Sequence, residues 1–247
     1  MVDIEHKSTQ FAKMQAARHR QIETLLRTMG TCTVDFLARE LAVSDMTIRR
    51  DLRQLADAGR IVRSHGGAAP AEQVLFEFQF LQRTQIAKQQ KEEIATTAAE
   101  LVRDGQSVLL DSGTTTLALA RRLVDRRGVT VITTSLPIAS VLQRSAGVET
   151  LLLGGFLRRD TPDLGGPLTE SNLDSLRADL AFVGADGVDL AGNVYNASIG
   201  IGQMLGKMAS RAAEAYVVAD STKFGRTQLK QFGNAANWRG LITDRGI

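Results

Sequence analysis

Residues 41–52 read LAVSDMTIRRDL, and this stretch decides the architecture of the N-terminal part of the chain. It joins a short predicted helix over residues 34–41 to a longer one over residues 45–58. Thr33 and Ser44 are placed to cap these two helices, because their hydroxyl oxygens can accept free backbone N–H groups of the first turn. A short helix that meets a longer one across a tight turn is typical of a helix-turn-helix.

The first turns of the longer helix carry the side chains that a helix-turn-helix presents to the major groove of DNA. Arg49 and Arg50 are adjacent and point about 100° apart, so one can reach a base edge while the other reaches a phosphate. A β bend follows, which could form a wing on the DNA backbone. The alternative is a plain three-helix bundle with a solvated charged face. The candidate DNA-binding residues are Ser44, Asp45, Met46, Thr47, Arg49, Arg50, Arg63 and His65.

The distribution of charge favours the DNA-binding interpretation. The chain has 247 residues and a net charge of +3. Residues 1–63 hold eleven Lys/Arg and eight Asp/Glu, whereas residues 64–247 hold nineteen of each. The whole excess therefore lies in the N-terminal segment, and a local cationic bias is what binding to phosphates needs.

The residues on either side complete the predicted organisation. A first helix is expected from about residue 12 to Gly30, with Ile22, Leu25 and Leu26 at helical spacing. Further along, Phe76, Phe78 and Phe80 alternate, which predicts an extended strip. This strip is either a linker docked on a second domain or a subunit contact. The predicted parts are a winged helix-turn-helix domain over 12–68, a linker over 69–86 and a second domain over 87–247.

From about Lys88 the pattern changes to alternating helices and short apolar strands. Such alternation predicts a mostly parallel sheet covered on both faces, and ligands bind such sheets at the carboxyl ends of the strands. The predicted strands cover 107–111, 129–133, 148–153, 180–184, 215–220 and 240–244, and the predicted helices cover 88–102, 117–123, 137–143, 168–176 and 202–213. The predicted fold class is therefore α/β, with a winged helix-turn-helix domain in front.

The loop that reads DSGTTT over residues 111–116 follows a predicted strand and opens a helix. Glycine permits close backbone approach, and hydroxyls with helix N-terminal N–H groups suit an anion. An ordinary strand–turn–helix with capping hydroxyls is the alternative. Asp186 could bind sugar hydroxyls and Lys223 could offset a phosphate. The candidate ligand-binding residues, all at strand ends, are Asp111, Ser112, Gly113, Thr114, Thr115, Thr116, Thr134, Gly154, Gly155, Asp186, Gly187 and Lys223.

These sequence motifs together resemble those of a known family. TIRRDL at 47–52 and HGGA at 65–68, with Leu55, Gly59 and Ile61 between them, resemble the winged helix-turn-helix of the DeoR family of bacterial regulators. The strand-end loops resemble the sensor domain of that family, which is similar in fold to ribose-5-phosphate isomerase and glucosamine-6-phosphate deaminase. The resemblance covers about residues 18–244.

The resemblance implies a transcriptional regulator, most often a repressor of a sugar or polyol catabolic operon. It also implies that the helix over residues 44–55 reads operator DNA, that the loop over 111–116 binds the phosphate of a phosphorylated sugar, and that Asp186 faces the sugar. Effector binding is then expected to weaken operator binding. A homodimer or homotetramer is expected. The sequence leaves repression and activation both open, and the stretch SIGIGQ at 198–203 departs from the acidic residue common there in the family.

Composition narrows the remaining possibilities. Cys32 is the one cysteine and is expected to be buried and inert, while the histidines at 6, 19 and 65 lack metal-ligand spacing, so neither a metal nor a cofactor is expected. We expect a cytoplasmic protein with no membrane partner, since the chain shows no signal-like start and no long apolar run. A phosphosugar enzyme is the alternative function, but the segment 66–247 contains no histidine to act as a base.

Overall fold

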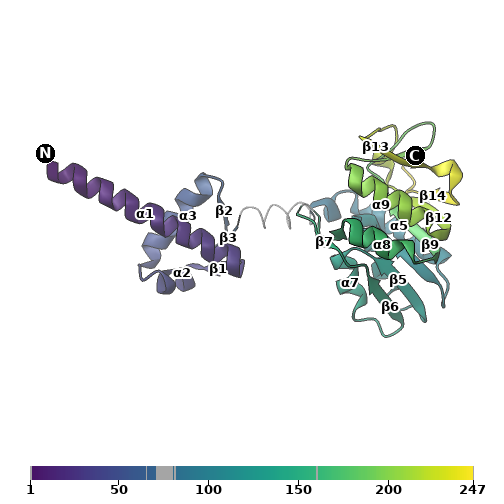
Figure 1. The fold of residues 1–247 in the computed structure, drawn as a ribbon, viewed down its shortest axis with the longest axis horizontal. Coiled ribbons are helices and arrows are strands. Elements are labelled where there is room, and N and C mark those ends of the chain that lie inside the picture. Colours follow the sequence, from purple (N-terminus) through teal and green to yellow (C-terminus); the bar gives the residue numbers. More distant parts are fainter. Residues whose placement is uncertain (1, 65, 71–79, 81, 160, 247) are drawn as a thin grey trace. The chain divides into compact units, whose positions relative to one another are not determined.

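The computed structural model describes residues 2–64, 66–70, 80, 82–159 and 161–246, with side chains described from Met14 onward. The chain divides into two compact units, unit 1 (Met1–Gln79) and unit 2 (Phe80–Ile247). Figure 1 shows the elements of each unit, coloured along the sequence.

Unit 1 is a winged helix-turn-helix. Its three strands form an antiparallel sheet in the order β1-β3-β2. Its elements are α1 (Val2–Met29), β1 (Cys32–Thr33), α2 (Val34–Glu40), α3 (Asp45–Asp57), β2 (Ile61–Arg63) and β3 (Gly67–Pro70). The two predicted caps are confirmed: the Thr33 hydroxyl accepts the Phe36 N–H at 3.2 Å, and the Ser44 hydroxyl accepts the Thr47 N–H at 3.3 Å.

The core of unit 1 comes from the apolar faces that helical spacing predicts. Ile22 and Leu26 of α1 are fully buried, as is Ile48 of α3. Cys32 lies in the same cluster, and burial raises the pKa of its thiol. The first helix is longer than predicted, since α1 begins at Val2 rather than near residue 12.

Unit 2 is built on a six-stranded parallel sheet in the order β14-β12-β9-β4-β5-β6. The strands are β4 (Ser107–Leu110), β5 (Val129–Thr133), β6 (Val148–Leu152), β9 (Ala178–Gly184), β12 (Ala212–Val218) and β14 (Gly240–Ile242). The helices are α5 (Lys88–Leu101), α6 (Thr114–Leu123), α7 (Leu136–Leu142), α8 (Pro167–Asp174) and α9 (Ile199–Ser210).

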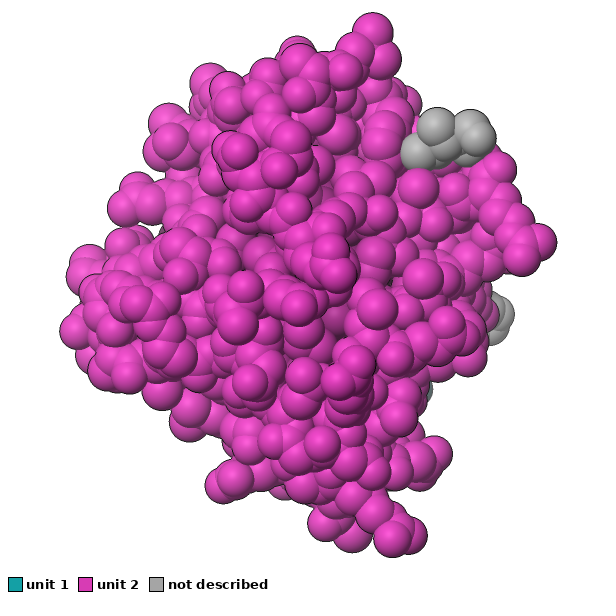
Figure 2. Space-filling model, turned by 90° about the vertical axis from the view of Figure 1, so that its right-hand side faces the viewer, with its two compact units in different colours: residues 1–79 teal, residues 80–247 magenta. Residues whose placement is uncertain are grey.

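Helices cover both faces of this sheet, as the sequence pattern predicts (Figure 1). Successive strand residues point to opposite faces, so Val108 and Leu110 of β4 join the core beneath α5, α6 and α7. Leu109 points the other way and packs with residues of α8 and α9. One face of unit 2 is shown in Figure 2, in magenta.

Some element bounds differ from the prediction. The helix α6 begins at Thr114 rather than at residue 117, and the chain enters β12 at Ala212, inside the predicted helix over 202–213. Alanine favours a helix by its intrinsic propensity, but the sheet register overrides this preference here: Ala212 pairs with Ala178.

Two small substructures are missing from the prediction. A hairpin joins β7 (Phe156–Leu157) to β8 (Leu164–Gly165), and a three-stranded antiparallel sheet contains β10 (Gly187–Val188), β11 (Asn193–Asn196) and β13 (Lys230–Asn234). Short 3-10 helices cover Ser221–Lys223 and Ala235–Asn237. Strands of two residues carry too little periodicity to predict.

The predicted linker over 69–86 includes residues that the structure places in each unit. Pro70 ends β3 of unit 1. Phe76 and Phe78 lie outside the described residues. Phe80 is helical and packs against the core of unit 2, so the prediction that it belongs to an extended strip is wrong. Residues 82–85 are helical as well.

Within the part of the chain that is described, no helix combines the length and the apolar character that crossing a membrane requires.

Candidate functional site

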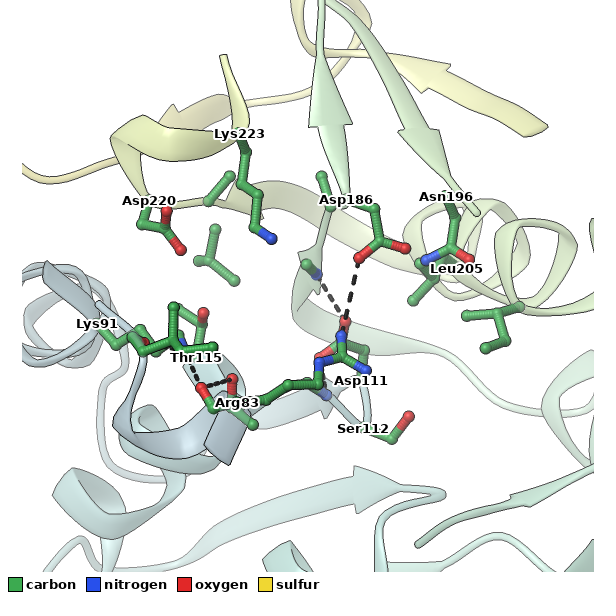
Figure 3. A pocket seen from close by; sticks show the side chains of 18 of the residues that line it. Arg83, Lys91, Asp111, Ser112, Thr115, Asp186, Asn196, Leu205, Asp220 and Lys223 are labelled. Carbon is green, nitrogen blue, oxygen red and sulfur yellow. Dashed lines mark hydrogen bonds and ion pairs between the residues drawn. The ribbon is translucent and has the colours of Figure 1, made fainter. Parts of the chain in front are cut away.

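A cavity of about 180 Å³ opens at the carboxyl ends of three neighbouring strands of unit 2, β4, β9 and β12 (Figure 3). Asp111 follows β4, Gly184 ends β9, and Ala219 follows β12. This is the edge at which parallel sheets bind ligands. Each strand therefore delivers one loop to the same pocket.

The loop after β4 presents the start of α6 to this cavity. Gly113 is the N-cap of α6 and has no side chain to accept the first-turn N–H groups. Its carbonyl accepts the Thr116 hydroxyl at 2.9 Å and the Leu117 N–H at 3.0 Å. Ser112, Gly113, Thr114 and Thr115 all line the cavity. Free N–H groups at a helix N-terminus bind anions well, because the helix dipole adds positive potential there.

Asp111 fixes the shape of this loop through hydrogen bonds to its carboxylate. One carboxylate oxygen accepts the Gly113 N–H at 2.9 Å and the Thr116 hydroxyl, and the other accepts the Gly184 N–H at 2.6 Å. The side chain is buried, and burial raises the pKa of Asp111 in spite of these hydrogen bonds. A carboxylate so fully engaged holds the loop; it is not free to bind a ligand directly.

Three cations surround the cavity. Arg83 lies 3.8 Å from the Asp186 carboxylate, and Lys223 points from the loop after β12 toward the same space (Figure 3). Lys91 is buried and donates to the carbonyl oxygens of Arg83 and Ile86, the latter at 2.7 Å. Burial lowers the pKa of Lys91 to about 8, with Asp220 opposing the shift and the neighbouring cations adding to it.

Beside these cations, the cavity also has groups suited to hydroxyls. Asp186 accepts the Ala197 N–H at 3.1 Å through one carboxylate oxygen, and the other faces Arg83. Asn196 is buried and accepts the Ser198 N–H at 2.9 Å through its amide oxygen. Ile201 and Leu205 of α9 add an apolar wall.

The structure brings together seven of the twelve predicted ligand-binding residues. Those that line the cavity are Asp111, Ser112, Gly113, Thr114, Thr115, Asp186 and Lys223. The five that do not are Thr116, Thr134, Gly154, Gly155 and Gly187. Lining residues that the sequence reading missed include Arg83, Lys91, Asn196 and Asp220.

The five residues outside the lining have supporting positions. Thr116 is buried beneath Asp111. The Thr134 carbonyl accepts the Leu164 N–H of the β7–β8 hairpin at 3.0 Å, and a Cβ on Gly155 would meet the Thr169 hydroxyl at 2.0 Å. Gly154 accepts the Thr169 hydroxyl, and Gly187 packs on the Arg226 carbonyl.

In unit 1 the predicted DNA-contact side chains share the exposed side of α3. Met46 is 80% exposed, and Asp45, Arg49 and Arg50 are exposed too. The opposite side of the helix is buried through Ile48, Asp51, Leu52 and Leu55. Ser44 is exposed, Thr47 is half-buried, and Arg63 is exposed on β2. His65 lies outside the described residues.

A winged helix-turn-helix joined to a parallel α/β unit with a pocket at its strand ends is the architecture of a DNA-binding transcription regulator. Two family models agree with this assignment. The DeoR-like helix-turn-helix domain matches residues 18–74, and the DeoR C terminal sensor domain matches residues 86–245. The chain belongs to the DeoR family of transcription regulators.

Curated relatives match nearly the full chain. The HTH-type transcriptional regulator GlpR of Haloferax volcanii is 36% identical over 94% of this chain and 90% of its own. The lactose phosphotransferase system repressor of Lactococcus lactis subsp. lactis is 36% identical over 93% and 91%, and the transcriptional repressor CsqR of Escherichia coli is 32% identical over 92% and 87%. These relatives are regulators, and this chain is a regulator and not a phosphosugar enzyme.

A solved structure is similar at a lower level. Ribose 5-phosphate isomerase A from Methanocaldococcus jannaschii matches with a TM-score of 0.42 and 22% identity, over 56% of this chain and 55% of that chain. A likeness at this level carries no information about chemistry.

Proposed function

We propose that this regulator represses genes for the breakdown of a sugar or polyol, and that it leaves its operator when a phosphorylated sugar binds in the pocket of unit 2. Two relatives have names that support this class of function. One is the lactose phosphotransferase system repressor, and the other is the glycerol-3-phosphate regulon repressor of Escherichia coli, which is 29% identical over 93% of this chain.

The observation that carries the effector class is the uncapped start of α6 in the pocket wall, between Arg83 and Lys223. Backbone N–H groups and two cations suit a phosphate dianion, since charge-assisted hydrogen bonds are about twice as strong as neutral ones. Asp186, which lies 3.8 Å from Arg83, and Asn196 suit sugar hydroxyls. The pocket therefore combines groups that suit a phosphate with groups that suit a polyol chain.

For the DNA, we propose that α3 enters the major groove with Asp45, Met46, Thr47 and Arg49 toward base edges and Arg50 toward a phosphate. Arg63 on the wing would add a backbone contact, and we extend this role to His65. A dimer or tetramer would place two α3 helices on an inverted repeat. Such a protein would act in the cytoplasm, where it can reach its operator.

The effector sets the outcome only through its different affinities for the DNA-bound and free conformations of the protein. A ligand that binds both equally would leave the operator occupied. Repression is proposed over activation because relatives CsqR and the lactose and glycerol-3-phosphate regulators carry the name repressor. A reporter gene placed behind the operator would lose expression on deletion of the regulator if the protein were an activator, and would gain expression if it is a repressor.

The test has two stages. First, a thermal-shift screen compares sugar phosphates with the same sugars lacking phosphate; a ligand at 100 times its Kd stabilises the protein by about 2.7 kcal/mol. Second, fluorescence anisotropy follows release of the promoter DNA beside the coding region. We expect only phosphorylated hits, and release by at least one of them. Binding of unphosphorylated sugars alone, or hits that never release DNA, would contradict the proposal.

A further inference from the structure

The β7–β8 hairpin contains a buried carboxylate that does not line the pocket. Asp163 has no exposed surface. One of its oxygens accepts Arg158 Nε at 2.8 Å and the Thr161 hydroxyl at 2.7 Å, and the other accepts the second Arg158 nitrogen. Within the hairpin, this carboxylate is paired with a cation and fully engaged.

One further bond of Asp163 leaves the hairpin. The Ser112 hydroxyl donates to the Asp163 carboxylate at 2.6 Å, and Ser112 belongs to the loop that opens α6. The two residues are separated by 51 positions in the chain. The loop is therefore held on both sides, by Asp111 through Gly113 and by Asp163 through Ser112.

The bond to Asp163 also fixes what Ser112 can offer a ligand. A hydroxyl has one proton to donate, and Ser112 gives this proton to the carboxylate. Its oxygen retains only acceptor capacity, which repels a phosphate oxygen. An anion at this loop is therefore left to the backbone N–H groups, whose directions depend on where Ser112 is held.

The hairpin itself is firmly attached to the sheet edge. The Leu136 N–H donates to the Pro162 carbonyl at 3.0 Å and the Leu164 N–H to the Thr134 carbonyl at 3.0 Å. Of the residues that hold the hairpin, Thr134 lies in the loop after β5 and Leu136 begins α7. Asp163 is thus a fixed point from which the neighbouring loop can be positioned.

We propose that Asp163, neutralised by Arg158, is a positioning residue for the anion-binding loop: by accepting the Ser112 hydroxyl it aims the N–H groups of α6 at the phosphate of the effector. The identity of the ligand as a phosphate rests on the proposed function. The positioning of the loop by Asp163 does not depend on the ligand, so the positioning role and the proposed function can fail separately.

The experiment uses the full chain with Asp163→Asn, Ser112→Ala and the double variant. The control is Asp174→Asn at the end of α8, which removes a carboxylate paired with Lys207 of α9 and with Arg211, the C-cap of α9, outside the pocket lining. Hydrogen exchange reports the amides of residues 112–116 without ligand, and titration with inorganic phosphate reports anion affinity. Ser112→Ala removes the Ser112–Asp163 hydrogen bond but keeps the Arg158–Asp163 pair, so this variant tests the proposal even if Asp163→Asn fails to fold.

We expect each single variant to speed exchange in the loop and to weaken phosphate binding by about tenfold, the usual effect of losing a hydrogen bond to a charged group. The double variant should be no weaker than Asp163→Asn by more than about twofold, because Ser112→Ala removes only the bond to Asp163 that this variant already disrupts. The control should match the wild type in both readouts.

Wild-type exchange or wild-type phosphate affinity in Asp163→Asn would overturn the positioning role. Additive losses in the double variant would overturn it too, because Asp163 would then act by another route than Ser112. If the wild type itself binds neither phosphate nor any sugar phosphate while exchange still rises in the variants, the proposed effector class fails and the positioning of the loop stands.

Discussion

Arg18 of α1 and Asp51 of α3 form an ion pair on the inner side of the helix predicted to contact DNA. Arg18 Nε lies 2.5 Å from Asp51 Oδ2, and Asp51 has no exposed surface. Gln15 and His19 also contact the carboxylate, at 3.2 and 3.1 Å. Burial alone would raise the pKa of Asp51, but the hydrogen bonds together lower it. The long first helix is thereby tied to α3 through a charged group.

Asp51→Ala should destabilise unit 1 strongly. Removing one member of a buried pair leaves the other charge without its partner, which costs about 3–5 kcal/mol. Urea denaturation followed by circular dichroism measures this loss. The matched control is Asp57→Ala, at the exposed end of α3, which should change stability by less than about 0.5 kcal/mol. Equal stability of the two variants would show that the pair contributes nothing.

Arg49→Ala should weaken specific operator binding by roughly 5- to 150-fold while leaving the fold intact. The side chain is exposed on the first turns of α3, so its removal creates no cavity. A base-contacting arginine contributes about 1–3 kcal/mol and its loss relaxes specificity at one position. Anisotropy with operator and scrambled DNA separates specific from general binding. A folded variant with the same preference for the operator as the wild type would remove Arg49 from the base-reading set.

Asp111→Ala should remove the effector response and leave DNA binding by the ligand-free protein unchanged. The variant orphans the Gly113 and Gly184 N–H groups, and each unsatisfied buried group costs about 1–3 kcal/mol. Unit 2 should therefore also melt earlier. The measurement is release of operator DNA over an effector titration, below the melting temperature of the variant. A normal midpoint for release would contradict the loop-holding role of Asp111.

Effector binding should weaken as the pH rises through about 8. The pKa of Lys91 is lowered to about 8 from its ordinary 10.5, so above this pH the free protein carries an uncharged Lys91. A bound phosphate favours the charged form, so binding at high pH requires proton uptake and loses affinity. The phosphate itself is already ionised, since its second pKa is about 6.

Calorimetry at about pH 7.5 and about pH 9.5 should show a loss of roughly tenfold in wild-type affinity. Lys91→Arg keeps its charge across this range and is the matched control, because arginine does not titrate below about pH 12. A pH dependence that is the same in both proteins would assign the effect to another group.

The sequence predicts the main elements because periodicity and capping are local signals. Ser44 caps α3 and Thr33 caps α2 as expected, and the six sheet strands coincide with the predicted apolar runs. The loop over residues 111–116 is also predicted to join a strand to a helix at the ligand-binding edge, since a glycine and hydroxyls between the two elements are visible in one short stretch of sequence. These features depend on residues within a few positions of one another.

The rest of the site depends on contacts between distant residues. Arg83 and Lys91 enter the pocket from the segment before the first strand of the sheet, and nothing in their local sequence points to a ligand. Asp163 reaches Ser112 across the sheet edge. Thr134 and Gly155 occur at strand ends, as predicted, but the unpredicted hairpin occupies the space beside them. Such pairings are set by the tertiary fold.

The cap of α3 has a consequence for how this protein could be directed to a new operator. Ser44 holds the Thr47 N–H, and losing an N-cap costs about 1 kcal/mol, so a non-capping residue there would affect folding as well as recognition. Among the described contacts, the side chains of Asp45, Met46 and Arg49 make no hydrogen bond within unit 1. A library aimed at altered base preference would therefore randomise these three positions and keep the serine constant.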